Sequence, residues 1–173
     1  MPSTLLPTVA VLTVTFLSGA SLSNSWFSLP FLLTTLTPST IPATLHTFAL
    51  LQAHADPIFP LIAVTTSLLH WTHAYRLHFA SGTVWAGAAT FCMITYSLAV
   101  VFPTVGKIEK VQSRVERNKA DRDNESGKVE AEEMRALLRR WNVQHIVRGL
   151  MPLVGTVVGL RALVRELGGG DGM

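Results

Sequence analysis

Charged residues are scarce in this sequence, and the scarcity narrows the class of protein. Of 173 residues only 14% are charged and 49% are hydrophobic, whereas about 25% of residues are charged in a typical soluble domain. Before Lys107 the only charged side chains are Asp56 and Arg76, while ten of the 14 Lys and Arg and eight of the 11 Asp and Glu lie between Lys107 and Arg140. This composition indicates a membrane protein.

Other absences exclude further classes. The single cysteine, Cys92, excludes a disulfide framework. No basic patch is interleaved with aromatic residues, so we expect no nucleic-acid partner. The sequence contains no phosphate-binding loop, dinucleotide fingerprint, nucleophile motif or haem-binding motif. Its first 20 residues lack the positively charged start of a secretory signal, so we expect them to stay in place as a membrane helix.

The apolar stretches predict one all-α domain over residues 1–173, built as a bundle of four transmembrane helices. A spanning helix needs ~20 mostly apolar residues. Each stretch is hydrophobic all round and lacks strict alternation, which favours helices over the strands of a barrel. Pro30 and Pro38 interrupt the apolar continuation of the first stretch. The predicted spans are 5–27, 58–75, 83–102 and 141–164.

Residues 104–140 form the only strongly hydrophilic segment, and we predict a charged loop there with helical portions. The centre, "NKADRDNESG", is typical of a turn. The apolar residues on either side have helical spacing: Ile108, Val111 and Val115 before the turn, and Val129, Met134, Leu137, Leu138 and Trp141 after it. Two interpretations stay open, a solvated loop and a surface that docks a partner protein. The Lys and Arg residues near the span ends place this segment in the cytosol and both termini in the lumen, in the endoplasmic reticulum or another endomembrane.

The last predicted span carries polar residues where a membrane helix is normally apolar: "RRWNVQHIVRGLMPLVGTVVGL". Trp141, His145 and Arg148 are separated by four and three residues, so they share one helical face. An ionisable group at this depth faces a partner or a cavity and marks a candidate functional site. The alternative is that Arg148 extends to the lipid headgroups while Trp141 lies at the membrane interface. Pro152 predicts a kink beside the carbonyl of Arg148.

Three weaker patterns have structural as well as functional interpretations. His70 and His73 could chelate a metal, but Tyr75 and Arg76 beside them favour anchoring at the membrane interface. Asp56 followed by proline is typical of a helix start, with pairing to Arg148 as the alternative. The spacing of Gly155 and Gly159 predicts close packing of helices.

At these motifs the chain resembles the small four-helix membrane proteins that include the fungal anthrone oxygenases of the noranthrone monooxygenase type. "WNVQHIVRGLMPLVGTVVGL" is similar to the family's fourth helix, and "FLSGASLSNSWFSLPFLL" to its first. "FPLIAV" is similar to the opening of its second helix, and "VFPTVGKI" to the exit of its third. The chain departs from the pattern at Val105 and His145, where the family commonly has Asn, and has only Phe48 where an aromatic pair is expected.

The resemblance implies a cofactor-independent oxygenase that converts an anthrone-type aromatic polyketide into an anthraquinone with molecular oxygen. It implies no metal site, and it makes the lipid bilayer and enzymes of the polyketide pathway candidate partners. The reaction needs a base and a fixed cation near the developing oxyanion. We expect His145, whose imidazole ordinarily titrates near neutrality, to be the base and Arg148 the cation. The expected substrate-binding residues are Trp141, Asn24, Phe48, Gln52 and His54.

The alternative function is a non-catalytic membrane scaffold or accessory protein that docks partners through the charged loop. Transport of a small solute is disfavoured, because four helices leave little room for alternating access.

Overall fold

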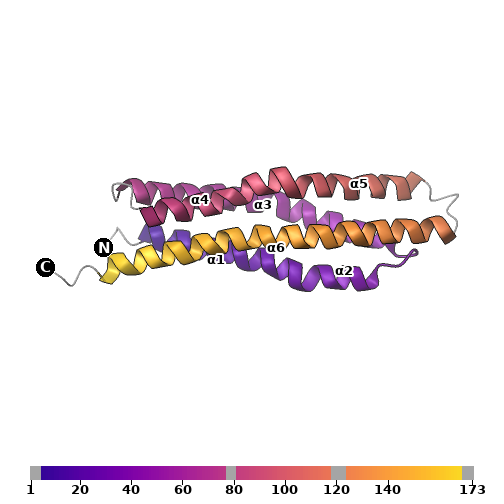
Figure 1. Ribbon diagram of the computed structural model, residues 1–173, viewed down its shortest axis with the longest axis horizontal. Helices are drawn as coiled ribbons and strands as arrows, with labels where there is room; N and C mark the ends of the chain where they lie inside the picture. Colours follow the sequence, from indigo (N-terminus) through magenta and orange to yellow (C-terminus); the bar gives the residue numbers. More distant parts are fainter. Residues whose placement is uncertain (1–4, 77–80, 118–123, 169–173) are drawn as a thin grey trace.

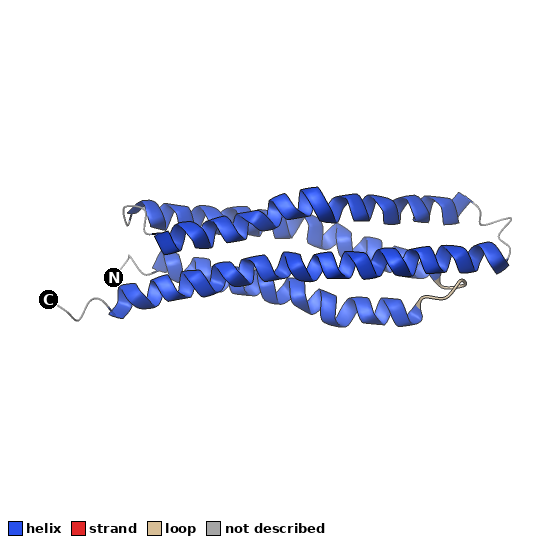
Figure 2. Ribbon diagram, in the orientation of Figure 1, coloured by secondary structure: helices blue, strands red, loops and turns tan. Residues whose placement is uncertain are grey.

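A computed structural model describes residues 5–76, 81–117 and 124–168, and all regular structure in these ranges is helical, with no strand among them (Figure 2). The elements in chain order are α1 (Leu5–Ser23), η1 (Asn24–Ser28), α2 (Leu29–Thr35), α3 (Ile41–Arg76), α4 (Ser81–Tyr96), η2 (Ser97–Val101), α5 (Phe102–Arg117) and α6 (Asn124–Gly168). The all-α prediction is confirmed within these residues.

The elements form four long antiparallel rods (Figure 1). The first rod is α1 with η1 and α2, the second is α3, the third is α4 with η2 and α5, and the fourth is α6. The start of α1, the end of α3, the start of α4 and the end of α6 lie at one end of the bundle, and the α2–α3 turn lies at the other (Figure 1). This up-and-down order is the common arrangement of four-helix bundles.

Two of the rods contain a short π-helical turn that ends two residues before a proline. In η1 the backbone N–H of Leu29 donates to the carbonyl of Asn24, and in η2 the N–H of Phe102 donates to that of Ser97. A proline ring crowds the carbonyl four residues back and cannot donate a hydrogen bond, and the wider π turn gives it room. The predicted break at Pro30 is therefore wrong, since the first rod continues to Thr35.

Three helical segments are long and apolar enough to cross a membrane: Leu5–Thr35, Gly82–Arg117 and Glu125–Arg165. They contain the predicted spans 5–27, 83–102 and 141–164, and they agree with the prediction of a membrane protein. The predicted span 58–75 lies within α3 and is not among the three. Length and composition of the described residues thus support three of the four predicted spans.

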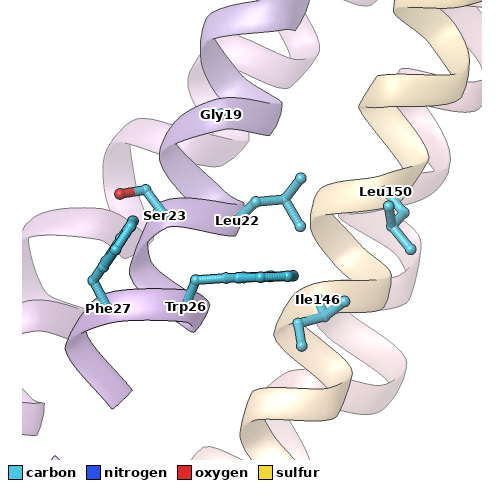
Figure 3. A pocket seen from close by; sticks show the side chains of 7 residues that line it. All are labelled: Gly19, Leu22, Ser23, Trp26, Phe27, Ile146 and Leu150. Carbon is cyan, nitrogen blue, oxygen red and sulfur yellow. The ribbon is translucent and has the colours of Figure 1, made fainter. Parts of the chain in front are cut away.

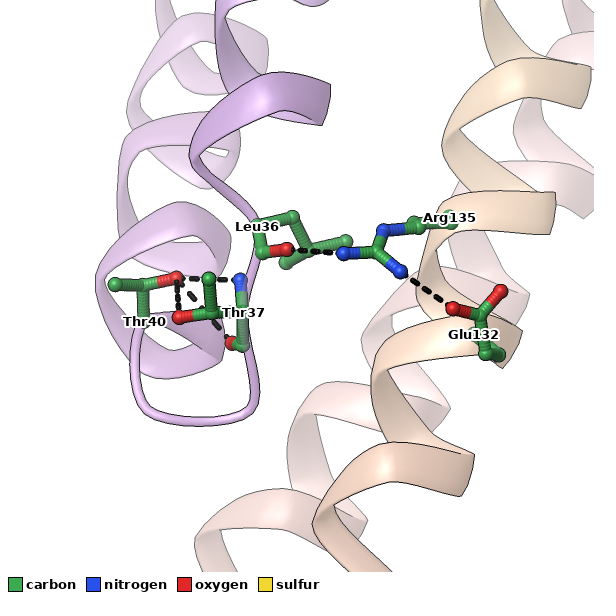
Figure 4. A network of polar contacts seen from close by, with 5 residues as sticks. All are labelled: Leu36, Thr37, Thr40, Glu132 and Arg135. Carbon is green, nitrogen blue, oxygen red and sulfur yellow. Dashed lines mark hydrogen bonds and ion pairs between the residues drawn. The ribbon is translucent and has the colours of Figure 1, made fainter.

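Helix α3 begins 16 residues earlier than the predicted start at Pro57. It runs without a break from Ile41 to Arg76, so Asp56 does not precede a helix. The side chains of residues 53–57, which include Asp56 and His54, lie outside the described part of the chain. The turn before α3 is closed by Thr40, whose hydroxyl accepts from the N–H of Thr37 at 2.7 Å (Figure 4). The same hydroxyl donates to the carbonyl of Thr35 at 2.6 Å.

The predicted charged loop 104–140 is mostly helix. α5 extends to Arg117 and α6 begins at Asn124, while residues 118–123 lie outside the description. The amphipathic pattern on both sides is confirmed, because Ile108, Val111 and Met134 are buried; Val129 is an exception and is exposed. Ile108, Val111 and Met134 belong to a core cluster that also includes residues of the first two rods. The cluster consists of Leu29, Leu32, Leu36, Ile41, Leu45, Phe48, Val101, Ile108, Val111, Val115, Ala131, Met134, Leu138 and Trp141.

An arginine ties this end of the bundle together. Arg135 on α6 donates to the carbonyl of Leu36 at 2.6 Å and pairs with Glu132 one turn earlier (Figure 4). The carbonyl of Leu36 belongs to the turn between α2 and α3, where no helical N–H is available to it. Arg135 therefore fixes the α2–α3 turn against α6.

Glycines bring α6 close to its neighbours at the other end of the bundle. A Cβ on Gly155 would lie 2.8 Å from the Thr90 hydroxyl and 3.0 Å from the Ala86 carbonyl, and one on Gly159 would lie 3.1 Å from His70 Cε1. A contact below 3.0 Å is not tolerated without movement, so Gly155 accepts no side chain as packed, and at Gly159 the neighbouring histidine ring would have to move by a few tenths of an ångström. The close packing predicted from the spacing of these two glycines is confirmed.

Candidate active site

The polar face predicted for the last span points into the bundle. His145 is 0% exposed and Arg148 2% exposed, and Trp141 is buried beside them. The residues come from the middle of α6, which continues through Pro152 to Gly168. Arg148 therefore does not extend to the surface, and the alternative of a headgroup contact does not describe this structure. A buried guanidinium is costly unless other groups compensate for its lost hydration, which makes this position a candidate site.

His145 is held between two helices. Its Nε2 lies 3.4 Å from the hydroxyl of Ser21 on α1, and its ring stacks on Trp141 with centroids 4.4 Å apart and an interplanar angle of 21°. Its Nδ1 has no hydrogen-bond partner among the described residues. In a neutral imidazole one nitrogen donates and the other accepts. The arrangement that leaves no buried N–H unpaired has Nε2–H donating to Ser21 and a lone pair on Nδ1.

Arg148 contacts an aromatic ring of α3. Its guanidinium carbon lies 5.5 Å from the ring centroid of Phe59, within the range of a cation–π interaction. The face of an aromatic ring carries partial negative charge, so Phe59 stabilises the cation without neutralising it. A guanidinium is charged at every relevant pH, and a cation held in an apolar region is what a group that stabilises a developing oxyanion needs.

The first two rods contribute the other predicted site residues. Phe48 of α3 packs edge-on against Trp141, with centroids 5.1 Å apart and an angle of 80°. Gln52 is buried one turn further along α3, and its amide nitrogen has no hydrogen-bond partner among the described residues. Asn24 of η1 is partly buried and lines a small cavity together with Phe48 and Trp141. His54 lies outside the described side chains.

That small cavity is not large enough for a substrate. Its volume is about 10 Å³, near the lower limit for a single water molecule. Phe48, Trp141 and Asn24 are thus already packed against one another. A flat polycycle would have to displace some of these side chains, or approach His145 from another direction.

A much larger hollow lies on the outer side of α1 and α6, the helices that carry Ser21 and His145. It measures about 570 Å³ and is bordered by residues of α1, η1 and α6 (Figure 3): Gly19, Leu22, Ser23, Trp26, Phe27, Ile146 and Leu150. Ile146 follows His145 directly in the chain, and Leu22 follows Ser21. The hollow therefore lies along the seam that holds the Ser21–His145 contact, on the side that faces away from the bundle interior.

The sequence interpretation did not single out Ser21 or Phe59. Ser18, Ser21 and Ser25 recur at intervals of three and four residues, and all three are buried. That spacing would have indicated a polar inner face on the first helix. Phe59 belongs to the "FPLIAV" stretch, but its contact with Arg148 depends on how the rods are aligned, which the spacing within one helix does not reveal.

His70 and His73 near the end of α3 are both buried within the bundle, while Tyr75 and Arg76 are exposed. Anchoring at the membrane interface is consistent with the exposure of Tyr75 and Arg76 and stays a prediction for this segment. Among the described residues no three His, Cys, Asp or Glu side chains gather in a way that could hold a metal ion.

Comparisons with known proteins agree with one another. The sequence profile of the anthrone oxygenase family matches residues 48–158. An anthrone oxygenase of Paecilomyces divaricatus is 31% identical over 92% of this chain and 95% of its own length, and one of Aspergillus fumigatus is 32% identical over 91% and 92%. A noranthrone monooxygenase of Aspergillus flavus is 26% identical over 88% of this chain and 70% of its own length. No solved structure matches.

Proposed function

Since the chain belongs to the anthrone oxygenase family, we propose that it oxidises an anthrone-type aromatic polyketide to the anthraquinone with molecular oxygen and without a cofactor. It is an anthrone oxygenase-like monooxygenase, which disfavours the alternative of a non-catalytic scaffold. The observation that carries the proposal is the burial of His145 and Arg148 side by side on α6.

The substrate itself supplies the electrons in this reaction. Loss of a proton from the methylene carbon, which lies between two aromatic rings and opposite a carbonyl, gives a delocalised anthrolate anion. The anion transfers one electron to oxygen, and the resulting radical and superoxide combine at the same carbon to form a peroxide. Protonation of the peroxide, removal of the second hydrogen from that carbon and cleavage of the O–O bond then release water. The balance is one anthrone and one O₂ to one quinone and one water.

His145 is the proposed base. With Nε2–H donated to Ser21, the lone pair on Nδ1 is free to accept the methylene proton. The resulting imidazolium can return the proton to the peroxide. Stacking on Trp141 holds the ring in one plane, so the base needs little reorganisation before it reacts.

Arg148 is the proposed electrostatic partner. The negative charge of the anthrolate collects on the oxygen opposite the reacting carbon, and a fixed cation in an apolar region stabilises it strongly. Cation–π contact with Phe59 positions the guanidinium. Trp141 and Phe48 are proposed to stack on the polycycle, and Asn24, Gln52 and His54 to bond its phenols.

The membrane arrangement is part of the proposal. We infer that α3 is the fourth crossing, because it lies antiparallel between two rods of similar length in the bundle (Figure 1). The α5–α6 end, with its Lys and Arg residues, faces the cytosol and the termini face the lumen of an endomembrane. His145 then lies within the bilayer, where an apolar polyketide dissolves. Pathway enzymes that supply the anthrone are candidate partners on the cytosolic side.

The test is oxidation of emodin anthrone by the purified protein in lipid nanodiscs under ¹⁸O₂, with no metal or flavin added and a chelator present. We expect one O₂ consumed for each quinone formed and one ¹⁸O atom in the new carbonyl. A rate no faster than that of empty nanodiscs would refute the proposed reaction. Loss of activity on chelation would refute the cofactor-independent mechanism alone.

A further inference from the structure

The hollow between α1, η1 and α6 has the features of a binding site for a flat aromatic molecule. Its volume of about 570 Å³ falls in the range, about 300–1,000 Å³, of pockets that hold small molecules. Its border is apolar apart from Ser23 and includes the rings of Trp26 and Phe27. A Cβ on Gly19 would meet nothing within 4 Å, so this part of α1 leaves open space.

The π turn η1 places the aromatic residues of this hollow. Trp26 and Phe27 lie within η1 and are exposed. Trp26 extends from η1 across the gap toward Ile146 of α6, below Leu22 (Figure 3). An indole in this position offers a flat face on which a second ring system can stack.

Leu22 borders the hollow and also lies close to the contact between Ser21 and His145. A Cβ on Gly149 would lie 3.2 Å from Leu22 Cγ, from Leu22 Cδ2 and from the Ser21 hydroxyl. Gly149 therefore forms a notch in α6 that Leu22 fills, and behind it lies the contact between Ser21 and His145. Rotation of Leu22 out of the notch would join the hollow to that contact, and side-chain rotations of this kind are fast compared with enzymatic turnover.

On the inner side of α6, the described cavity beside Trp141 and Phe48 has a volume of about 10 Å³ and cannot hold a polycycle. We propose that the hollow between α1, η1 and α6 binds the flat polycyclic substrate as it leaves the bilayer, and that the substrate reaches His145 by passing Leu22 at Gly149. This proposal rests on the proposed function for the identity of the substrate. Trp26 stacks on the rings, and Ser23 bonds a phenol at the rim.

Two leucines of α6 provide a matched test. Leu150 borders the hollow and is 44% exposed, while Leu160 lies on the same helix away from it and is 48% exposed. Tryptophan at position 150 fills the hollow, whereas tryptophan at 160 adds the same bulk to another part of the surface. Neither leucine is buried, so both variants are expected to fold.

The experiment measures two quantities for wild type, Leu150→Trp, Leu160→Trp and Trp26→Ala in nanodiscs. The first is kcat/KM for oxidation of emodin anthrone, and the second is the affinity for emodin, the unreactive quinone, which reports on the hollow without catalysis. We expect both variants Leu150→Trp and Trp26→Ala to lower kcat/KM and the emodin affinity by about tenfold or more. Leu150→Trp fills the hollow, and Trp26→Ala removes an aromatic stack that contributes about that much. Leu160→Trp should match the wild type.

The outcomes separate this inference from the proposed function. If the wild type turns over and Leu150→Trp binds emodin and reacts as the wild type does, the hollow is not the substrate site although the reaction stands. If no variant reacts but emodin binding is lost only in Leu150→Trp and Trp26→Ala, the reaction fails and the aromatic site stands. If Leu150→Trp loses a co-purifying phospholipid and keeps its emodin affinity, a lipid chain occupies the hollow and the inference is overturned.

Discussion

Replacing Arg148 by methionine should separate catalysis from stability. Methionine has a comparable length and no charge, and Arg148 is 2% exposed beside the ring of Phe59. Removing one member of a buried charge interaction destabilises a protein by up to about 3–5 kcal/mol. The lost cation–π contact alone costs about 2 kcal/mol in a desolvated site, and the burial of a thioether in place of a guanidinium offsets part of the loss. We therefore expect the free energy of unfolding to fall by about 2–4 kcal/mol.

Activity should fall by much more than the loss of folded protein explains. If Arg148 stabilises the enolate oxygen, its removal should lower kcat by about 10²–10³-fold, the effect of removing one donor from an oxyanion site. The assay is quinone absorbance at saturating emodin anthrone, and thermal unfolding in the same nanodiscs is its companion. Arg148→Lys keeps the charge but not the planar group, so it should recover part of the rate. A stable Arg148→Met protein with wild-type kcat would refute the reasoning, as would a rate loss fully explained by unfolding.

Three further predictions concern packing and positioning. Gly155→Ala should lower the free energy of unfolding by about 1–3 kcal/mol, because its Cβ would meet Thr90 and a backbone carbonyl. Gly106→Ala, whose Cβ would meet nothing within 4 Å, should raise the free energy of unfolding by about 0.5–1 kcal/mol. The measurement is thermal unfolding of both variants, and shifts of the same sign would contradict the prediction. Arg135→Ala should lower the free energy of unfolding by about 1 kcal/mol, because it removes the hydrogen bond to the α2–α3 turn. The control Arg139→Ala, at an exposed position, should lower it by less than about 0.5 kcal/mol. Equal midpoints of chemical denaturation for the two variants would show that the bond to the turn does not stabilise the protein. Ser21→Ala should lower kcat by about tenfold and leave KM unchanged, because it removes the hydrogen-bond partner of His145 Nε2. The pH profile of kcat should change as well. A change in KM alone would mean that Ser21 contacts the substrate instead.

The inner face of α6 could be predicted because its pattern is local. Trp141, His145 and Arg148 are separated by four and three residues, and charged side chains are otherwise rare in the predicted spans. The close approach at Gly155 and Gly159 was readable for the same reason. In each case the geometry of a single helix determines which residues share a face.

Features that depend on two helices or on tertiary packing could not be read in this way. Pro30 looks like a break, and only the π turn before it lets the first rod continue. Asp56 followed by Pro57 looks like a helix start, yet α3 passes through both because it packs along the bundle from Ile41 onward. The contacts of Ser21 with His145 and of Phe59 with Arg148 depend on the alignment of separate rods.

The central claim is that the imidazole of His145 removes the proton from the substrate. The direct measurement is single-turnover oxidation of emodin anthrone by His145→Gln, which keeps a group able to donate to Ser21 but has no basic nitrogen. We predict a rate of quinone formation about 10²–10⁴-fold below that of the wild type, with emodin affinity unchanged. A correctly folded His145→Gln protein that forms quinone within about threefold of the wild-type rate, well inside the effect expected of a general base, would contradict the account.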